Sequence, residues 1–317
     1  MAYFDVFNGD ADGICALQQL RLIKPREAML VTGVKRDIEL LARVRANPGD
    51  EVTVLDISLD RNRDALLGLL ERGVRVRYFD HHFPEAIPEH RELDVRIETL
   101  PYKGTSLLVD DFLGGKCRVW AVVGTFGDNF EAAARRAAAP LGLDKAQLAT
   151  LRELGICLNY NAYGARLEDL YLAPDELFRR LRSYADPFAF VAADPAFRTL
   201  RAGYAEDMAR ARALKSELAG DHYALYILPA KPWARRASGL LANQLARTSA
   251  GRAHALLTRL STGGFVVSVR APMATGTGAD ALCRRFPTGG GRRAAAGIDY
   301  LPDDSYDEFV RQFMAAF

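Results

Sequence analysis

Four short motifs of aspartate and histidine punctuate the first 128 residues, and each follows a strand-like apolar run. In chain order the motifs are Asp10-Ala11-Asp12-Gly13, Asp56, Asp80-His81-His82 and Gly127-Asp128-Asn129. The runs before them are residues 3–7, 52–55, 74–79 and 119–124. The carboxyl ends of parallel strands meet at one edge of an open α/β sheet, where such sheets bind their ligands. We therefore expect the motifs to converge, and their crowded carboxylates and imidazoles predict a divalent-metal site.

The stretches between these runs have the periodicity of helices. Residues 13–22 place Ile14, Leu17 and Leu20 on one face, which is typical of an amphipathic helix. Further helices are expected at 38–44 and 61–73, and further strands at 28–32 and 51–56. Repeated strand–helix–strand units with short connections predict a doubly wound, mostly parallel α/β sheet.

The rest of the chain predicts a helical segment and then a second, smaller α/β domain. Helices are expected at 131–141, 145–158, 174–184 and 199–218. Strands are expected at 223–228, 253–260 and 265–270, helices at 238–248 and 279–286, and a loop at 288–291. The predicted organisation is a metal-binding domain at 1–195, a linker helix at 196–220 and a smaller domain at 221–317.

The composition is that of an ordinary soluble globular chain, because 49% of the 317 residues are apolar and 26% are charged. No apolar run approaches the roughly 18–20 residues of a membrane helix, and the chain begins directly with a strand-like run. A cytoplasmic protein without membrane partners is expected. The four cysteines show no C-x-x-C spacing, which argues against a disulfide framework and a cysteine-ligated zinc.

Charge is distributed unevenly along the chain. Residues 221–317 contain 12 Lys/Arg against 7 Asp/Glu, whereas residues 1–220 contain 30 against 33. This asymmetry suits a first domain that holds cations and a second domain that binds an anion. Arginine supplies 35 of the 42 basic residues, so genome composition explains the basic tail equally well.

Taken in order, the four motifs resemble those of the DHH phosphoesterase superfamily. Ser268-Val269-Arg270 and the run Gly289-Gly290-Gly291-Arg292-Arg293 resemble the DHHA1 domain of its oligoribonuclease- and RecJ-like single-strand nuclease branch. The resemblance extends from Val6 to Ile298. A lone Asp-x-Asp-Gly also occurs in calcium loops and turns, so the ordered set carries the resemblance.

The resemblance implies two Mn²⁺ or Mg²⁺ ions, and carboxylate and imidazole groups are suitable ligands for them. Asp10 and Asp12 would serve one ion each, and Asp56 would bridge both. His81 and Asp128 would complete the shell of the second ion. Two such ions activate water and stabilise charge at phosphorus.

Three further positions follow from the resemblance. Asp80 would orient His81 or bind a metal-bound water, and His82 would contact the scissile phosphate or the leaving oxygen. Relatives carry His or Asp a few residues before the Asp-x-Asp, where this chain has Asn8. An amide is a weaker ligand, so the first ion is expected to bind loosely or to arrive with substrate.

Two segments are candidates for binding an anionic substrate. Backbone N–H groups of Gly289, Gly290 and Gly291 can approach an anion closely, and Arg270 with Ser268 can bind phosphate. Arg292 stands where most relatives have His, which favours a terminal phosphate. Read alone, the three glycines also fit a flexible turn, as the less favoured alternative. Thr105 and Ser106 begin a predicted helix, where they fit an anion site and a simple N-cap equally well.

The implied activity is metal-dependent hydrolysis of short single-stranded oligonucleotides or linear dinucleotides to mononucleotides. Rival activities are processive digestion of long DNA, a nucleotide-bisphosphate phosphatase, and a polyphosphate or cyclic-dinucleotide hydrolase. A nucleotide-binding regulator with a degenerate metal site is the non-enzymatic rival, and Asn8 is its support. Cleavage polarity, the choice between RNA and DNA, and homodimer formation are left open.

Overall fold

The computed structural model describes residues 1–317, which form two compact units, Met1–Tyr204 and Ala205–Phe317. The boundary falls inside helix α9 (Pro195–Arg212), within the segment expected to be a linker. Each unit has its own β-sheet and its own hydrophobic core. None of the helices combines the length and the hydropathy that a membrane crossing would need.

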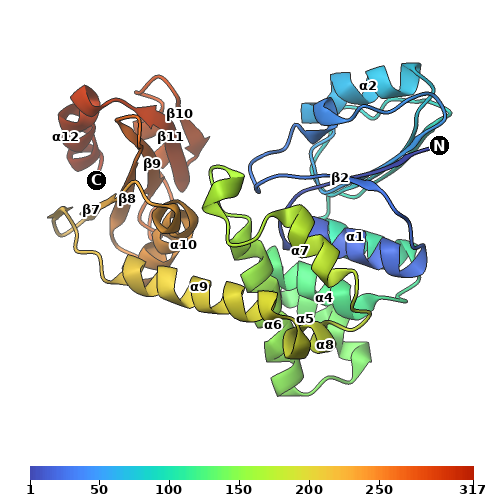
Figure 1. The fold of residues 1–317 in the computed structure, drawn as a ribbon. Coiled ribbons are helices and arrows are strands. Elements are labelled where there is room, and N and C mark those ends of the chain that lie inside the picture. Colours follow the sequence, from blue (N-terminus) through green and yellow to red (C-terminus); the bar gives the residue numbers. More distant parts are fainter. The chain divides into compact units, whose positions relative to one another are not determined.

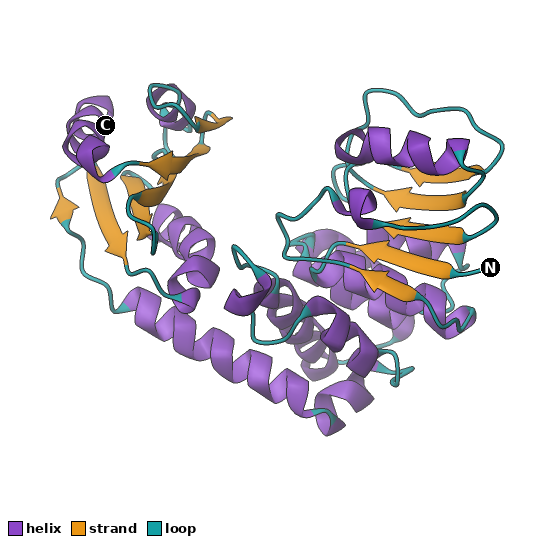
Figure 2. Ribbon diagram, turned by 45° about the horizontal axis from the view of Figure 1, so that its top comes forward, coloured by secondary structure: helices purple, strands orange, loops and turns teal.

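The sheet of unit 1 is entirely parallel, which confirms the predicted α/β class. Its strands lie in the order β2 (Met29–Val31), β1 (Tyr3–Phe7), β3 (Glu51–Leu55), β4 (Arg75–Asp80) and β5 (Leu93–Ile97). Figure 2 shows these strands side by side. From β1 the chain first adds β2 on one side and then β3 on the other. The direction of winding therefore reverses next to β1, which is where doubly wound sheets bind ligands.

Side chains of these strands alternate between two faces, and each face is covered by helices (Figure 1). Phe7, Leu55 and Phe79 pack in the main core with residues of α1 (Ala11–Ile23), α3 (Thr105–Phe112) and α4 (Arg118–Gly127). Val6 and Val54 pack on the other face with α2 (Arg63–Glu71) and the short 3₁₀ helix η1 (Leu40–Arg43). Burial on both faces explains why the apolar residues of β1 and β3 are not confined to alternate positions in the sequence.

The helical segment predicted after residue 130 is present. It contains α5 (Glu131–Ala138), α6 (Lys145–Asn161), α7 (Pro174–Leu181) and α8 (Pro187–Ala193). A capping box between Asp144 and Gln147 begins α6, and such a box satisfies backbone donors that a helix start leaves unpaired. Proline at the first position begins α7 and α8, where it costs no hydrogen bond.

Two predictions for unit 1 are wrong. Residues 119–124, expected to be a strand, lie inside α4, where every residue from Trp120 to Gly127 is buried. A short apolar run that is buried on all sides has no periodicity to separate strand from helix. Residues 38–44, expected to be a helix, contain only the single 3₁₀ turn η1.

Unit 2 is built on a six-stranded mixed sheet. The strand order is β10 (Gly289–Arg292), β11 (Ala295–Leu301), β9 (Phe265–Arg270), β8 (Ala253–Arg259), β7 (Tyr223–Leu228) and β6 (Leu218–Ala219). Only β7 and β8 pair in parallel. Its helices are α10 (Pro232–Thr248), α11 (Ala279–Cys283) and α12 (Tyr306–Ala316), and its core includes Phe265, Phe309 and Phe313.

The glycine run 289–291, expected to be a loop, is the edge strand β10, paired with β11. Close packing requires glycine at two of its positions, Gly289 and Gly291. A Cβ atom at Gly289 would overlap the carbonyl oxygen of Cys283, and Gly291 has φ +133° against the backbone of Ala296. Space around Gly290 is open, so that position alone leaves room for a ligand to approach the backbone.

Candidate metal centre

The four motifs of unit 1 meet at the carboxyl end of its sheet, as predicted. The Nε2 atom of His81 lies 3.4 Å from Oδ1 of Asp56 and 3.9 Å from Oδ2 of Asp128. Asp12 belongs to the same cluster, since its ligand atom and those of His81 and Asp128 all lie within 4.8 Å of one another. Asp128 enters from the end of α4, and the other residues enter from the ends of strands or the turn after β1.

Asp10 shapes the turn between β1 and α1. Its Oδ1 accepts hydrogen bonds from the backbone N–H groups of Asp12 (3.0 Å) and Gly13 (3.1 Å), so Asp10 is the N-cap of α1. An aspartate N-cap satisfies donors that the helix leaves unpaired and favours the positive end of its dipole. Its second oxygen is left for contacts within the cluster.

Asp12 is fully buried and is held by the N-terminus of α3. Its two oxygens accept the backbone N–H groups of Thr105 (2.6 Å) and Ser106 (2.8 Å). The Thr105 hydroxyl donates to Oδ1 of Asp56 at 2.9 Å. The anion at this helix N-terminus is therefore a carboxylate of the chain itself, and Thr105 and Ser106 fix the two aspartates.

Asp56 adopts a left-handed backbone conformation, with φ +61°. Non-glycine residues rarely adopt it, although Asp and Asn tolerate it best. The conformation places a fully enclosed carboxylate beside His81. Such local strain concentrates at functional sites, where surrounding contacts maintain it.

The two imidazole rings of the Asp80-His81-His82 motif lie in different environments. The side chain of His81 is 16% exposed and faces the cluster, whereas that of His82 is 46% exposed. Oδ1 of Asp80 accepts the backbone N–H of His81 and lies 2.7 Å from Nδ1 of His82. Asp80 thus orients the ring of His82, whereas the sequence analysis expected it to orient His81 or to bind a metal-bound water. Its buried Oδ2 has no hydrogen-bond partner in the chain.

Lys35, which the sequence analysis overlooked, reaches into the cluster from the loop after β2. Its Nζ forms an ion pair with Asp10, lies 3.1 Å from Oδ1 of Asp128 and donates to Oδ1 of Asn159 at 3.3 Å. Its position after a strand is the same signal that marked the four motifs. Asn8, predicted to be a metal ligand, supports this loop: it donates to the Lys35 carbonyl and accepts from the Asp10 N–H, both at 3.2 Å.

In unit 2, Arg270 is the centre of the predicted anion-binding residues. Its guanidinium donates to Oδ1 of Asn243 (2.8 Å) and to Oγ of Ser268 (3.0 Å). Burial, with a smaller effect of neighbouring Arg292, lowers the pKa of Arg270. A surface pocket of about 380 Å³ adjoins these residues; its lining includes Asn243, Arg247, Arg270, Met273 and Ala295.

No family model and no curated protein matches the sequence. Solved structures do match. RecJ exonuclease bound to manganese is 17% identical with a TM-score of 0.66, covering 99% of this chain and 90% of that one. A pGpG-specific phosphodiesterase from Vibrio cholerae is 13% identical with a TM-score of 0.55 over the full length of both chains. The chain has the DHH/DHHA1 fold.

The Mn²⁺ complex of RecJ from Thermus thermophilus, 19% identical with a TM-score of 0.64, has the same fold. The match covers 99% of this chain and 51% of that one, so the chain spans about half the length of that RecJ. These likenesses confirm the fold expected from the motif order.

The cluster of Asp10, Asp12, Asp56, His81 and Asp128 carries an excess of negative charge. Burial raises the pKa of Asp56 well above its usual range, and the charges of Asp10 and Asp12 add to this effect. Burial likewise raises the pKa of Asp128 to about 6, against the lowering effect of the nearby lysine. Burial lowers the pKa of His81, but the hydrogen bond and charge of Asp56 and the other aspartates raise it to about 10. The centre therefore attracts protons or metal cations.

The donor set fits a hard divalent cation. Two neighbouring ligand atoms of an octahedral ion, each about 2.1 Å from the metal, lie about 3 Å from one another. In the cluster, Nε2 of His81 lies 3.4 Å from an oxygen of Asp56 and 3.9 Å from an oxygen of Asp128. Carboxylate oxygens and one imidazole suit Mn²⁺ or Mg²⁺, and no thiol that would favour a soft metal belongs to the cluster. The unpartnered Oδ2 of Asp80 is a ready acceptor for a metal-bound water.

Proposed function

We propose that the chain is a Mn²⁺- or Mg²⁺-dependent phosphodiesterase that hydrolyses short single-stranded oligonucleotides or linear dinucleotides to mononucleotides. The observation that carries this proposal is the buried cluster of aspartates around His81, whose charge is not balanced by the chain. The printed activities of the structural neighbours, an exonuclease and a pGpG-specific phosphodiesterase, support the reaction class.

Asp12, Asp56, His81 and Asp128 would hold the metal. A bound divalent ion would lower the pKa of a coordinated water and stabilise the charge that develops at phosphorus. Thr105 and Ser106 keep Asp12 and Asp56 in place through hydrogen bonds. Because both partners lie in the first turn of α3, the ligands are held in place before a cation binds and need little reorganisation.

We assign contact with the reacting phosphate to His82. Asp80 lies 2.7 Å from its Nδ1, which fixes the ring and directs Nε2 away from Asp80. When both ring nitrogens carry a proton, Nε2 can donate a hydrogen bond to a phosphate or leaving oxygen. Its side chain is nearly half exposed, so a substrate can reach it. Asp80 is then a positioning residue for His82.

We assign anchoring of a second anionic group to unit 2. Arg270 is preorganised by Asn243 and Ser268, and the adjoining pocket of about 380 Å³ also presents Arg247. A planar guanidinium held by two side chains suits a phosphate oxygen pair. The open space at Gly290 and the exposed side chain of Arg292 extend this surface.

The test is an assay of the purified chain with Mn²⁺ on end-labelled oligonucleotides of two to about twenty residues, a linear dinucleotide and a nucleotide bisphosphate. We expect mononucleotides, fastest release from the shortest substrates, and no reaction in EDTA. His81→Ala should match the EDTA blank, whereas His90→Ala, a change at an exposed histidine, should behave like the wild type. Release of phosphate only from the bisphosphate would contradict the phosphodiesterase assignment.

One observation favours the non-enzymatic alternative, a nucleotide-binding regulator. Lys35 already neutralises part of the acidic cluster through Asp10 and Asp128. A regulator would bind nucleotides without bound Mn²⁺ and would turn over none of the substrates above.

A further inference from the structure

We propose that the ammonium group of Lys35 occupies the place of one of the two cations, so that the centre binds a single divalent ion. This inference rests on the proposed metal dependence. The single ion would be held by Asp12, Asp56, His81 and Asp128, and Lys35 would remain bound to Asp10.

The contacts of Lys35 account for all of its hydrogen-bonding capacity. An ammonium group has three donors, and Nζ has three oxygen neighbours, in Asp10, Asp128 and Asn159. The side-chain Oδ1 of Asn159 is oriented toward Lys35, because Nδ2 of the same amide donates to the Tyr163 hydroxyl at 2.8 Å. Each donor of the ammonium group therefore faces an oxygen atom of the chain.

The backbone on which Lys35 stands is fixed to two other elements. Its N–H donates to the Ala162 carbonyl at 3.0 Å, just after α6, and its carbonyl accepts the Asn8 amide. Both polar atoms of the Asn8 side chain are hydrogen-bonded: Nδ2 donates to the Lys35 carbonyl, and Oδ1 accepts the Asp10 N–H. The backbone N–H and the carbonyl of Lys35 are both hydrogen-bonded, so the position of this lysine beside the cluster is fixed by the fold.

The carboxylates divide into two groups around this lysine. Asp10 faces Lys35 with one oxygen, while its other oxygen caps α1. Asp12, His81 and Asp128 offer ligand atoms within 4.8 Å of one another, with Asp56 beside His81. A dication at Asp10 would compete with an ammonium group that is already in contact, and like charges repel. In the second group only Asp128 also contacts Lys35, through Oδ1, and its Oδ2 is the oxygen that faces His81.

With the ammonium group of Lys35 in one of the two cation positions, the centre needs only one divalent ion from solution. The positive charge of Lys35 is covalently attached, so it is present at any metal concentration and a chelator cannot remove it. It also places a positive charge close to the metal ligands, where it can stabilise negative charge that develops on a phosphate oxygen. We expect metal dependence to follow the binding of one ion.

The decisive measurement is the number of Mn²⁺ ions bound per chain, obtained by isothermal titration calorimetry and by elemental analysis after gel filtration in Mn²⁺. We expect one ion in the full-length wild type and two in Lys35→Met. Lys103→Met is the matched control, because Lys103 also bridges two carboxylates, Glu98 and Asp111, at 2.7 and 2.6 Å. It should bind one ion.

A second variant keeps the test informative if Lys35→Met does not fold. With a single ion held elsewhere, Asp10→Asn should still bind one Mn²⁺, with affinity within about threefold of the wild type. Two bound ions in the wild type would overturn this inference and leave the proposed function intact. A single bound ion in a folded Lys35→Met variant would have the same consequence. No bound ion in the wild type would refute the proposed metal dependence itself.

Discussion

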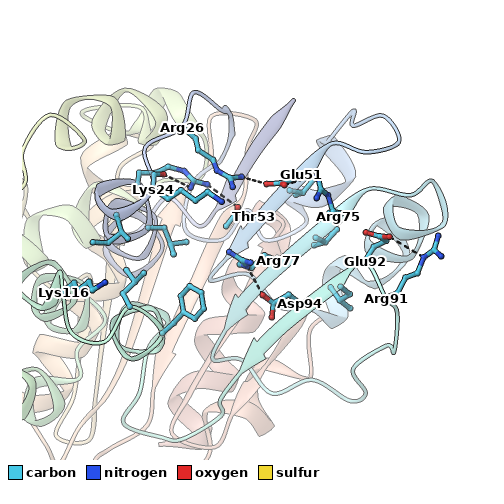
Figure 3. A pocket seen from close by; sticks show the side chains of 18 residues that line it. Lys24, Arg26, Glu51, Thr53, Arg75, Arg77, Arg91, Glu92, Asp94 and Lys116 are labelled. Atoms are coloured by element: carbon cyan, nitrogen blue, oxygen red, sulfur yellow. Dashed lines mark hydrogen bonds and ion pairs between the residues drawn. The ribbon is translucent and has the colours of Figure 1, made fainter. Parts of the chain in front are cut away.

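The two ends of the parallel sheet in unit 1 carry the same kinds of charged side chain but balance them differently. The amino end opens into a groove of about 550 Å³ (Figure 3). Its arginines each have a carboxylate: Arg26 and Arg75 pair with Glu51, Arg77 with Asp94 at 2.9 Å, and Arg91 with Glu92 at 3.4 Å. Each of these arginines therefore has an acidic partner, although Glu51 serves two of them and Lys24 and Lys116 add positive charge to the lining.

At the carboxyl end, five aspartates share one lysine and the histidine pair. They are Asp10, Asp12, Asp56, Asp80 and Asp128, and four of them are buried. Burial and the neighbouring negative charges raise the pKa values of Asp56 and Asp128, as expected where carboxylates outnumber cations. The difference teaches that an excess of buried negative charge, and not the number of charged residues or the size of a hollow, distinguishes the end of this sheet that we propose as the metal site.

The largest expected contrast between the two ends comes from Asp56→Asn. We expect kcat/KM to fall to the level of the EDTA blank, because the change removes a central ligand charge. The metal-free variant should melt at the same temperature as the wild type or higher, because a buried charge is lost and asparagine tolerates φ +61°. Calorimetry and the oligonucleotide assay check both parts. Wild-type turnover in this variant would refute the role of Asp56.

The pH dependence of stability should also reveal the imbalance. The folded-state pKa values of Asp128, about 6, and His81, about 10, are raised. Each group therefore stabilises the metal-free fold below its unfolded pKa, and this contribution is lost as pH rises through the folded value. For Asp128 the loss falls between about pH 4 and 6, and for His81 between about pH 6.5 and 10.

Mn²⁺ replaces those protons, so the melting-temperature difference between Mn²⁺ and EDTA samples should be larger at pH 8.5 than at pH 6. Scanning calorimetry in both buffers measures it, and Asp56→Asn should shrink the difference. An equal Mn²⁺ effect at both pH values would contradict the imbalance.

A smaller effect is expected in unit 2. Arg270→Ala should raise KM about tenfold or more with little change in kcat, because a hydrogen bond to a charged group contributes about 1.5–3 kcal/mol. Arg284→Ala is the control, since Arg284 is an exposed arginine with its own partner, Asp280. Steady-state kinetics on a dinucleotide separates the two constants. A fall in kcat alone would assign Arg270 to the chemical step.

The smallest effect is expected at the amino end of the sheet. Asp94→Asn breaks an ion pair whose two side chains are 45% and 42% exposed, so the free energy of unfolding should fall by less than about 1 kcal/mol. Turnover should stay within twofold of the wild type. A Mn²⁺ requirement altered by this variant would show that the groove also takes part in metal binding.

Sequence reasoning predicted the parallel sheet and the convergence of the four motifs because buried strands and their polar ends leave a local signature. Asp10, Asp56 and His81 could be placed at one edge from strand order alone. Asp128 was placed there for an incorrect reason, since α4 is as apolar as a buried strand. The strand β5 has no fully buried residue and left no apolar signal.

Lys35 could not be assigned from sequence, because surface lysines are common and its role depends on contacts with Asp10, Asp128 and Asn159. These partners lie up to 124 positions away along the chain. The three glycines of β10 were equally ambiguous. Only the packing of Cys283 and Ala296 against them distinguishes a tightly packed edge strand from a flexible turn.

The most direct test of the account is anomalous diffraction at the manganese edge from crystals of the chain soaked in Mn²⁺. We predict one strong peak bound by Nε2 of His81 and the carboxylates of Asp56 and Asp128, and none among the paired charges of Glu51, Glu92 and Asp94. A peak in that groove, or none at the aspartate cluster, would contradict the assignment of the carboxyl end as a metal centre.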